Sequence, residues 1–113
     1  MTRTVPGWPT SLPAPGTIEF NQRVTGWLLD RGPAELRGSA LASSPVLLAY
    51  VVQRHVEGAV ESLRQAYGGI RGDLSGDIPP DVLAAGQQAM EKIGASLAQQ
   101  AREVALVFRA LRT

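Results

Sequence analysis

The last third of the chain carries two columns of mostly apolar residues that repeat every seven positions. The first column consists of Leu83, Met90, Leu97, Val104 and Leu111. The second lies at the paired position and has one polar member; it consists of Gly86, Ile93, Gln100 and Val107. Such a repeat is typical of a coiled-coil seam. It predicts one long helix over residues 80–111.

A row of small residues runs beside this seam and consists of Gly94, Ala98, Ala101 and Ala105. Small side chains allow a neighbouring helix to approach closely, because the distance between helix axes depends on the side chains at the contact. The seam and the small row together offer more surface than one neighbouring helix can cover. We therefore expect a second copy of the chain to cover part of residues 80–111.

A second long helix is predicted over residues 45–67. Ser44 can accept hydrogen bonds from free backbone N–H groups at its start, and Pro45 suits the first helical position. Apolar residues then recur at spacings of four and three, namely Val52, Val56, Ala59, Leu63 and Ala66. The first two turns, residues 46–52, are apolar nearly all round, which predicts that this end is buried on several sides.

A shorter helix is predicted over residues 18–31, with Thr17 as its N-cap. Its apolar residues share one side and are Phe20, Val24, Trp27 and Leu28. Gly32 and Pro33 are expected to end this helix, and residues 33–38 predict one further short helical turn. The helix over 18–31 is the natural cover for the apolar start of the helix over 45–67.

The segment between the two long helices, residues 68–80, contains four glycines and two prolines. This composition predicts that Gly68 and Gly69 end the second helix and that an irregular loop of about a dozen residues follows. Two long helices joined in this way favour an antiparallel hairpin. On these boundaries the last helix is longer than its partner by about ten residues, and either the first helix or a second copy must cover the excess.

These elements predict an all-α fold: an antiparallel helical hairpin with a shorter N-terminal helix, completed to a bundle by homodimerisation. The single helical domain is expected over residues 17–113. Residues 1–16 contain four prolines and predict an extended or disordered tail. Trp8 stands out in this tail, because a large apolar ring gains little from exposure to water. It either folds back onto the domain or docks on a partner.

Composition narrows the classes of function. The net charge is +1, whereas nucleic-acid-binding domains are usually clearly basic. The chain has no cysteine, which excludes disulfides and Cys-ligated metals and fits the cytoplasm. The longest apolar run is about eight residues, far below the roughly 20 needed to cross a bilayer. The Pro-rich start also lacks the apolar core of a signal peptide. We therefore expect a cytoplasmic protein without a membrane segment.

His55 is the only histidine, and Glu57 and Glu61 follow it on the same predicted helix. At about 100° per residue, these carboxylates lie roughly 200° and 240° around the helix from His55, so neither can share a metal ion with it. A metal held by two symmetry-related His55 side chains across a dimer axis stays open.

With one histidine and no cysteine, hydrolase-type constellations of nucleophile and base are nearly excluded. Paired carboxylates among Asp73, Asp77 and Asp81 stay formally open, although turn and cap roles explain them. We expect no catalytic residue, cofactor or metal.

The predicted function is that of a small non-enzymatic helical protein–protein interaction module, acting as a scaffold, a regulator or a chaperone. We expect a homodimer and a further protein partner, with Trp8 in a partner-docking tail. The expected dimer or partner interface consists of Leu83, Met90, Ile93, Leu97, Ala101, Val104, Phe108 and Leu111.

The alternative is a weak nucleic-acid-binding or regulatory protein with an arginine face near its C-terminus. Arg102, Arg109 and Arg112 are the residues that would contact an anion or nucleic acid. Ten of the eleven basic residues are arginine, which suits bidentate phosphate contacts. A GC-rich coding sequence explains the same bias.

Overall fold

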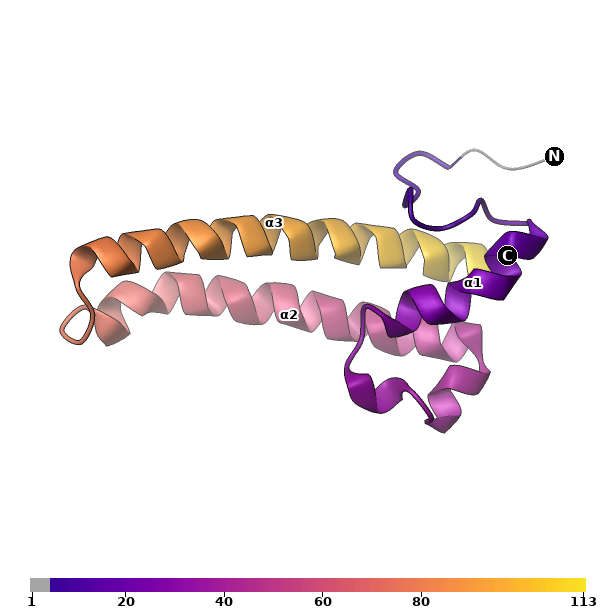
Figure 1. Cartoon of the computed structure of the whole chain (residues 1–113), viewed down its shortest axis with the longest axis horizontal. Helices are drawn as coiled ribbons and strands as arrows, with labels where there is room; N and C mark the ends of the chain where they lie inside the picture. Colours follow the sequence, from indigo (N-terminus) through magenta and orange to yellow (C-terminus); the bar gives the residue numbers. More distant parts are fainter. Residues whose placement is uncertain (1–4) are drawn as a thin grey trace.

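The computed structural model describes residues 5–113, which form helices joined by turns, with no strand among them (Figure 1). The helices are α1 (Ile18–Leu29), α2 (Pro45–Leu74) and α3 (Pro80–Leu111). Two short 3₁₀ helices, η1 (Ala34–Leu36) and η2 (Ala40–Ser43), connect α1 to α2. The prediction of an all-α fold with two long helices packed against each other is confirmed.

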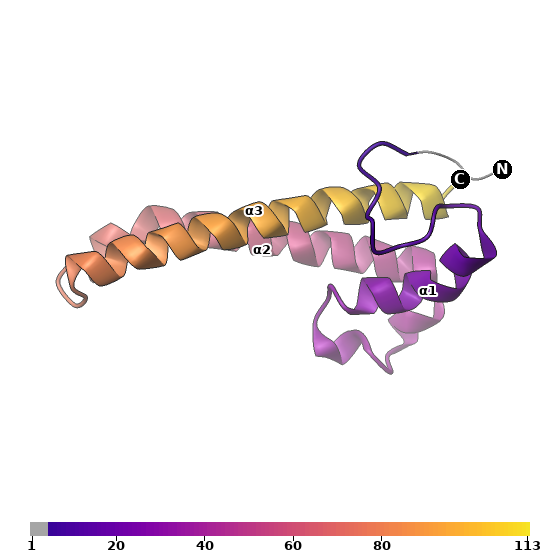
Figure 2. The ribbon, with the colours of Figure 1, turned by 45° about the horizontal axis from the view of Figure 1, so that its top comes forward.

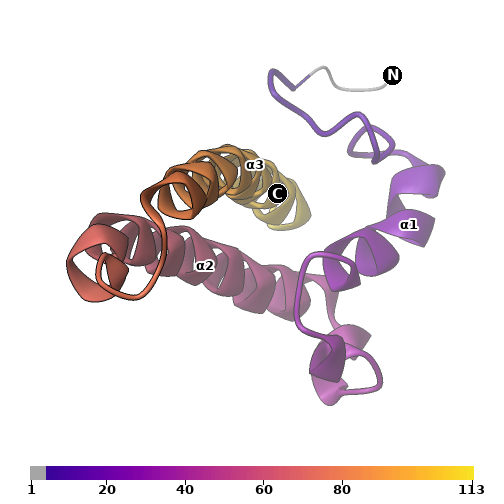
Figure 3. The ribbon, with the colours of Figure 1, turned by 60° about the vertical axis from the view of Figure 1, so that its left-hand side comes forward.

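The two long helices lie antiparallel and side by side along a molecule that measures 57 × 31 × 17 Å (Figure 1). α1 lies beside one end of this hairpin only, where α2 begins and α3 ends (Figures 2 and 3). The connector between α2 and α3 forms the opposite end. We call residues 57–100 the tip, and the remaining described residues the head.

The starts of α1 and α2 agree with the capping residues that the sequence predicts. The Thr17 side chain accepts a hydrogen bond from the backbone N–H of Phe20 at 3.1 Å. The Ser44 side chain accepts one from the backbone N–H of Leu47 at 3.3 Å, and Pro45 occupies the first helical position. Both caps satisfy backbone donors that a helix start leaves free. α1 ends at Leu29, two residues earlier than predicted.

The predicted end of α2 at Gly68 is wrong, because the helix continues through Gly68 and Gly69 to Leu74. Glycine ends a helix well when it adopts a positive φ, and neither of these glycines does so. Ile70 and Leu74 continue the apolar pattern at a spacing of four. The packing of α2 against α3 as a whole offsets the roughly 1 kcal/mol that each glycine costs a helix.

This correction removes one argument for a second copy of the chain. The connector is only residues 75–79, and α2 and α3 contain 30 and 32 residues. The last helix therefore has no excess of about ten residues that needs separate cover. A second copy could therefore cover only the surface that the packed hairpin leaves exposed.

The hydrophobic core lies in the head. The predicted stripe of α1 is buried there, and it consists of Phe20, Val24, Trp27 and Leu28. From the hairpin, the fully buried partners are Leu48, Val52, Val56, Val104 and Val107. Leu36 of η1 closes the same cluster. In the tip, by contrast, only Leu83 is buried among the described apolar side chains.

The first two turns of α2 are less covered than their all-round apolar pattern predicts. Leu48 and Ala49 are buried, but Val46, Leu47 and Tyr50 are 40–46% exposed. α1, η2 and α3 are the elements that pack on α2, and together they leave one side of its start uncovered. The prediction of burial on several sides is therefore right for part of this segment and wrong for the rest.

Residues 5–16 lie against the head. The Trp8 ring is half-buried, with its centroid 5.8 Å from that of Phe20. Its indole N–H donates to the carbonyl oxygens of Leu12 at 3.1 Å and Pro13 at 3.2 Å. Leu12 is itself buried in the core. The structure agrees with the interpretation in which Trp8 folds back onto the domain. Residues 1–4 of the predicted tail lie outside the described residues.

Candidate protein interaction surface

Two shallow hollows lie between α2 and α3. The hollow in the tip has a volume of about 350 Å³ and is lined by Val60, Leu63, Arg64, Tyr67, Met90, Glu91, Gly94 and Ala98. The second has a volume of about 400 Å³ and is lined by Gln53, Ala105, Phe108, Arg109, Arg112 and Thr113. Among the described residues, none from α1, η1, η2 or the N-terminal segment lines either hollow.

Helical spacing places both hollows on the same side of the hairpin. Residues seven positions apart share a side of a helix in a coiled-coil pair. Three such series link the tip hollow to the head hollow: Gly94, Ala101 and Phe108; Ala98, Ala105 and Arg112; and, on α2, Tyr67, Val60 and Gln53. We call the residues that line the two hollows, together with Ala101 and Tyr50, the groove face.

The row of small residues predicted from the sequence lies along this groove face. A Cβ added at Gly94 would lie only 3.6 Å from Leu63 Cδ2, so α2 and α3 are close together there. Ala98 lines the tip hollow and Ala105 lines the head hollow, and each contributes only a methyl group. From Met90 to Phe108 the groove face is about 27 Å long, at about 1.5 Å per residue. A helix of about five turns matches that length.

At the tip end of the groove face, a tyrosine and a carboxylate bridge the two helices. The Tyr67 hydroxyl donates a hydrogen bond to Glu91 Oε1 at 2.8 Å. This hydrogen bond, with the negative charge of Glu91, raises the pKa of Tyr67 above its ordinary value. Arg64 pairs with Glu61 at 2.7 Å, but both side chains are well exposed, so this pair stabilises little.

At the head end of the groove face, arginines stack on aromatic rings. Tyr50 and Phe108 meet edge to face, with ring centroids 6.1 Å apart. The Arg54 guanidinium lies 5.3 Å from the Tyr50 ring centroid, and that of Arg112 lies 5.3 Å from the Phe108 ring centroid. Both distances fall within the range of a cation–π contact. This end is therefore aromatic and basic, whereas the tip end carries a carboxylate.

The predicted interface residues have different surroundings in the single chain. Leu83 and Val104 are buried against their own chain, and Met90, Leu97, Ala101, Phe108 and Leu111 are half-buried. Met90 and Phe108 line the groove face. Ile93 is 51% exposed, although Val107 in the same seven-residue column is fully buried. α1 covers that column in the head and does not reach Ile93, which lies about 21 Å further along the helix.

Sequence reasoning placed the whole interface on the last helix and missed the contribution of α2. Val60 and Tyr67 line the tip hollow, and Tyr50 is 46% exposed at the other end. These residues widen the apolar stripe of α2 beyond its strict spacing of three and four. That widening was the available signal, because an apolar stripe broader than one partner helix leaves an edge uncovered.

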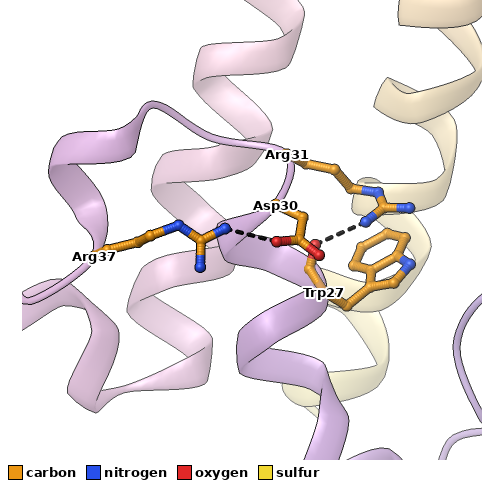
Figure 4. A network of polar contacts seen from close by, with 4 residues as sticks. All are labelled: Trp27, Asp30, Arg31 and Arg37. Atoms are coloured by element: carbon orange, nitrogen blue, oxygen red, sulfur yellow. Dashed lines mark hydrogen bonds and ion pairs between the residues drawn. The ribbon is translucent and has the colours of Figure 1, made fainter.

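A separate polar cluster holds the end of α1 in place (Figure 4). The Arg31 guanidinium stacks on Trp27, 3.7 Å from the ring centroid, and donates to the Trp27 carbonyl oxygen at 2.8 Å. Its partial burial lowers the pKa of Arg31, while nearby Glu103 and Asp30 act in the opposite direction. Asp30 also pairs with Arg37 at 2.6 Å. The Trp27 indole N–H donates to Ser11 Oγ at 2.8 Å, which ties the N-terminal segment to α1.

The three C-terminal arginines are divided between two hollows. Arg109 and Arg112 line the head hollow of the groove face. Arg102 and Arg109 line a different hollow, beside Pro6 and Gly7 of the N-terminal segment. Arg102 also donates to the Gln99 side-chain oxygen at 2.6 Å. The predicted arginine face is therefore continuous only through Arg109.

His55 is exposed on α2, and its side chain makes no hydrogen bond or ion pair among the residues described. Within residues 5–113, no three His, Cys, Asp or Glu side chains lie together in a way that could hold a metal ion. In the same range, no helix combines the length and the apolar character that crossing a membrane requires.

Comparisons with protein-family models, with curated proteins and with solved structures found no match for this chain.

Proposed function

We propose that the protein is a small non-enzymatic interaction module that self-associates and docks a protein partner, as a scaffold, a regulator or a chaperone. The observation that carries this proposal is the groove face. It is a groove about 27 Å long, apolar at its tip end and mixed aromatic and basic at its head end, and no described residue of α1 or the N-terminal segment lines its two hollows. Exposed apolar grooves of this kind mark sites of protein–protein interaction.

The aromatic residues at the two ends of the groove face support the same proposal. Tyr50, Tyr67 and Phe108 have large rings, and aromatic residues are enriched at the centres of protein interfaces. Tyr50 and Tyr67 remain well exposed in the single chain. Covering them would remove apolar surface from water, which favours association by roughly 25 cal/mol for each Å² buried.

A non-enzymatic role is supported by the inventory of reactive side chains. The chain has one histidine and no cysteine, and a nucleophile needs a base within hydrogen-bond reach. A cytoplasmic location is part of this proposal, because a chain without cysteine gains nothing from an oxidising compartment.

The test is the absolute mass of the purified protein, measured by light scattering on a sizing column over a hundredfold dilution. We expect twice the chain mass of 12.0 kDa at the higher concentrations. Ala98→Arg, which places a long charged side chain in the tip hollow, is expected to abolish the dimer. Ala95→Arg is the matched control, because Ala95 is exposed on the same helix and does not line the groove face. A monomer throughout, or equal effects of both variants, would contradict the proposal.

The alternative function, weak nucleic-acid binding, is favoured by one observation. The basic head end of the groove face places Arg109 and Arg112 beside the Phe108 ring, and single-stranded nucleic acid binds to grooves that combine arginine with aromatic side chains. Titration with a labelled single-stranded oligonucleotide tests it. Binding that falls steeply with salt and is lost in Arg109→Ala would support this alternative.

A further inference from the structure

The head and the tip carry opposite net charge. The tip contains six acidic and three basic residues, a net charge of −3. The described part of the head contains seven basic and four acidic residues, a net charge of +3. The overall charge of +1 hides this division, because the two halves nearly cancel.

The division extends along the groove face itself. At the head end, Arg109 and Arg112 line the groove, and Arg54 stacks over Tyr50. At the tip end, Glu91 lines the groove. Glu57 is on the same side of α2, seven positions from both Tyr50 and Arg64, but it lies level with Ala101 and so in the middle of the groove. Arg64 also lines the tip end but pairs with Glu61, so the net charge at this end of the groove is negative.

We infer that the groove face is covered by the groove face of a second copy lying antiparallel, so that each tip lies against the partner's head. This inference rests on the proposed self-association and adds its interface and direction. A two-fold axis near Ala101 would bring the small-residue rows of the two copies together. The basic end of each groove would then meet the acidic end of the other.

Charge decides between this arrangement and a parallel one. A parallel pair places Arg109 and Arg112 of both copies together at one end of the groove and Glu91 of both copies together at the other. Interactions between exposed charges fade beyond about 8 Å at physiological ionic strength, so the charges that meet locally determine the preference. Antiparallel packing makes both ends attractive, and like-charge contacts oppose the parallel pair.

A distance measurement tests the direction. The chain has no cysteine, so Ser75→Cys gives a single spin label in the exposed connector. In an antiparallel dimer the two labels lie at opposite ends, and pulsed electron paramagnetic resonance should give a distance comparable with the 57 Å length of the molecule. A short distance between the labels would overturn the inference while leaving self-association intact. A monomer by light scattering would overturn both.

Charge reversal supplies a second, independent test. Arg109→Glu with Arg112→Glu changes the net charge of the head from +3 to −1, and Glu61→Arg with Glu91→Arg changes that of the tip from −3 to +1. Each double variant should dissociate about tenfold more readily than the wild type at low salt. An equimolar mixture of the two should recover a heterodimer, because each reversed head then meets a reversed tip. In a parallel dimer each double variant alone would associate more tightly than the wild type, and that result would overturn the inference.

Discussion

The head and the tip are built from the same two helices, yet they differ in how those helices are covered. In the head, α1, η1 and the N-terminal segment complete a core in which Leu28, Leu48, Val52 and Val104 are fully buried. In the tip, α2 and α3 cover only each other, and a single apolar side chain, Leu83, is buried among those described. An antiparallel pair of helices can bury one stripe of each helix but not both flanks of the stripe. The head therefore supplies most of the stability of the single chain, and the tip leaves apolar surface exposed, which is available to the partner that we propose.

The largest expected difference between the two regions is in the cost of removing a leucine. Leu28→Ala in the head should lower the free energy of unfolding by about 3–5 kcal/mol, because the fully buried side chain leaves a cavity. Leu63→Ala in the tip should cost about 1–2 kcal/mol, because Leu63 is only half-buried. Denaturation with urea, performed below the dissociation constant of any dimer, measures both. Equal costs would mean that the tip is as well packed as the head.

A somewhat smaller difference in destabilisation is expected between Trp8 of the N-terminal segment and Tyr67 of the tip. Trp8→Ala should lower the free energy of unfolding by about 2 kcal/mol, because it removes a half-buried ring and two hydrogen bonds from the head. Tyr67→Ala, which removes an exposed ring from the tip, should cost less than 1 kcal/mol in the monomer. Thermal unfolding followed by circular dichroism compares them. No loss from Trp8→Ala would show that the segment adds nothing to the head.

Two glycine substitutions, one in the head and one in the tip, should change the free energy of unfolding in opposite directions. In Gly32→Ala, the added Cβ would lie 2.6 Å from Leu36 Cδ1 and 3.3 Å from Val52 Cγ2 in the head, so we expect destabilisation by about 1 kcal/mol. In Gly68→Ala, the added Cβ meets nothing within 4 Å, and the helix of the tip should gain about 0.5–1 kcal/mol. Urea denaturation of both variants measures the signs. A destabilising Gly68→Ala would contradict a continuous helix through Gly68.

The smallest expected effect is a change in the pH at which Tyr67, in the tip, titrates. Because its folded-state pKa is raised, neutral Tyr67 contributes stability that is complete below the unfolded pKa of about 10. This contribution is lost as the pH rises through the folded-state pKa. Glu91→Gln should shift the Tyr67 titration to lower pH, as followed by ultraviolet absorbance in a Tyr50→Phe background. An unchanged titration would mean that the bond between Tyr67 and Glu91 does not form in solution.

The sequence allowed the helix starts to be predicted because their signals are local. Thr17 and Ser44 accept hydrogen bonds from backbone N–H groups three residues later, so no distant contact is needed to identify them. The apolar stripe of α1 is equally local, since a spacing of three and four residues fixes which side a helix buries. The end of α2 could not be predicted in the same way. The pair Gly68 and Gly69 predicts a helix end, but in the folded hairpin α2 continues through both residues to Leu74.

By itself, therefore, the sequence determined that this protein is helical, where its three main helices begin, and which stripe of α1 is buried. Only the tertiary structure decided how far α2 extends, that α1 covers just one end of the hairpin, and that Tyr50, Tyr67 and Phe108 share one open side. The physical reason is the range of the forces involved. Capping and helical periodicity act within a few residues, whereas cover depends on contacts between elements distant in the chain, which no local pattern specifies.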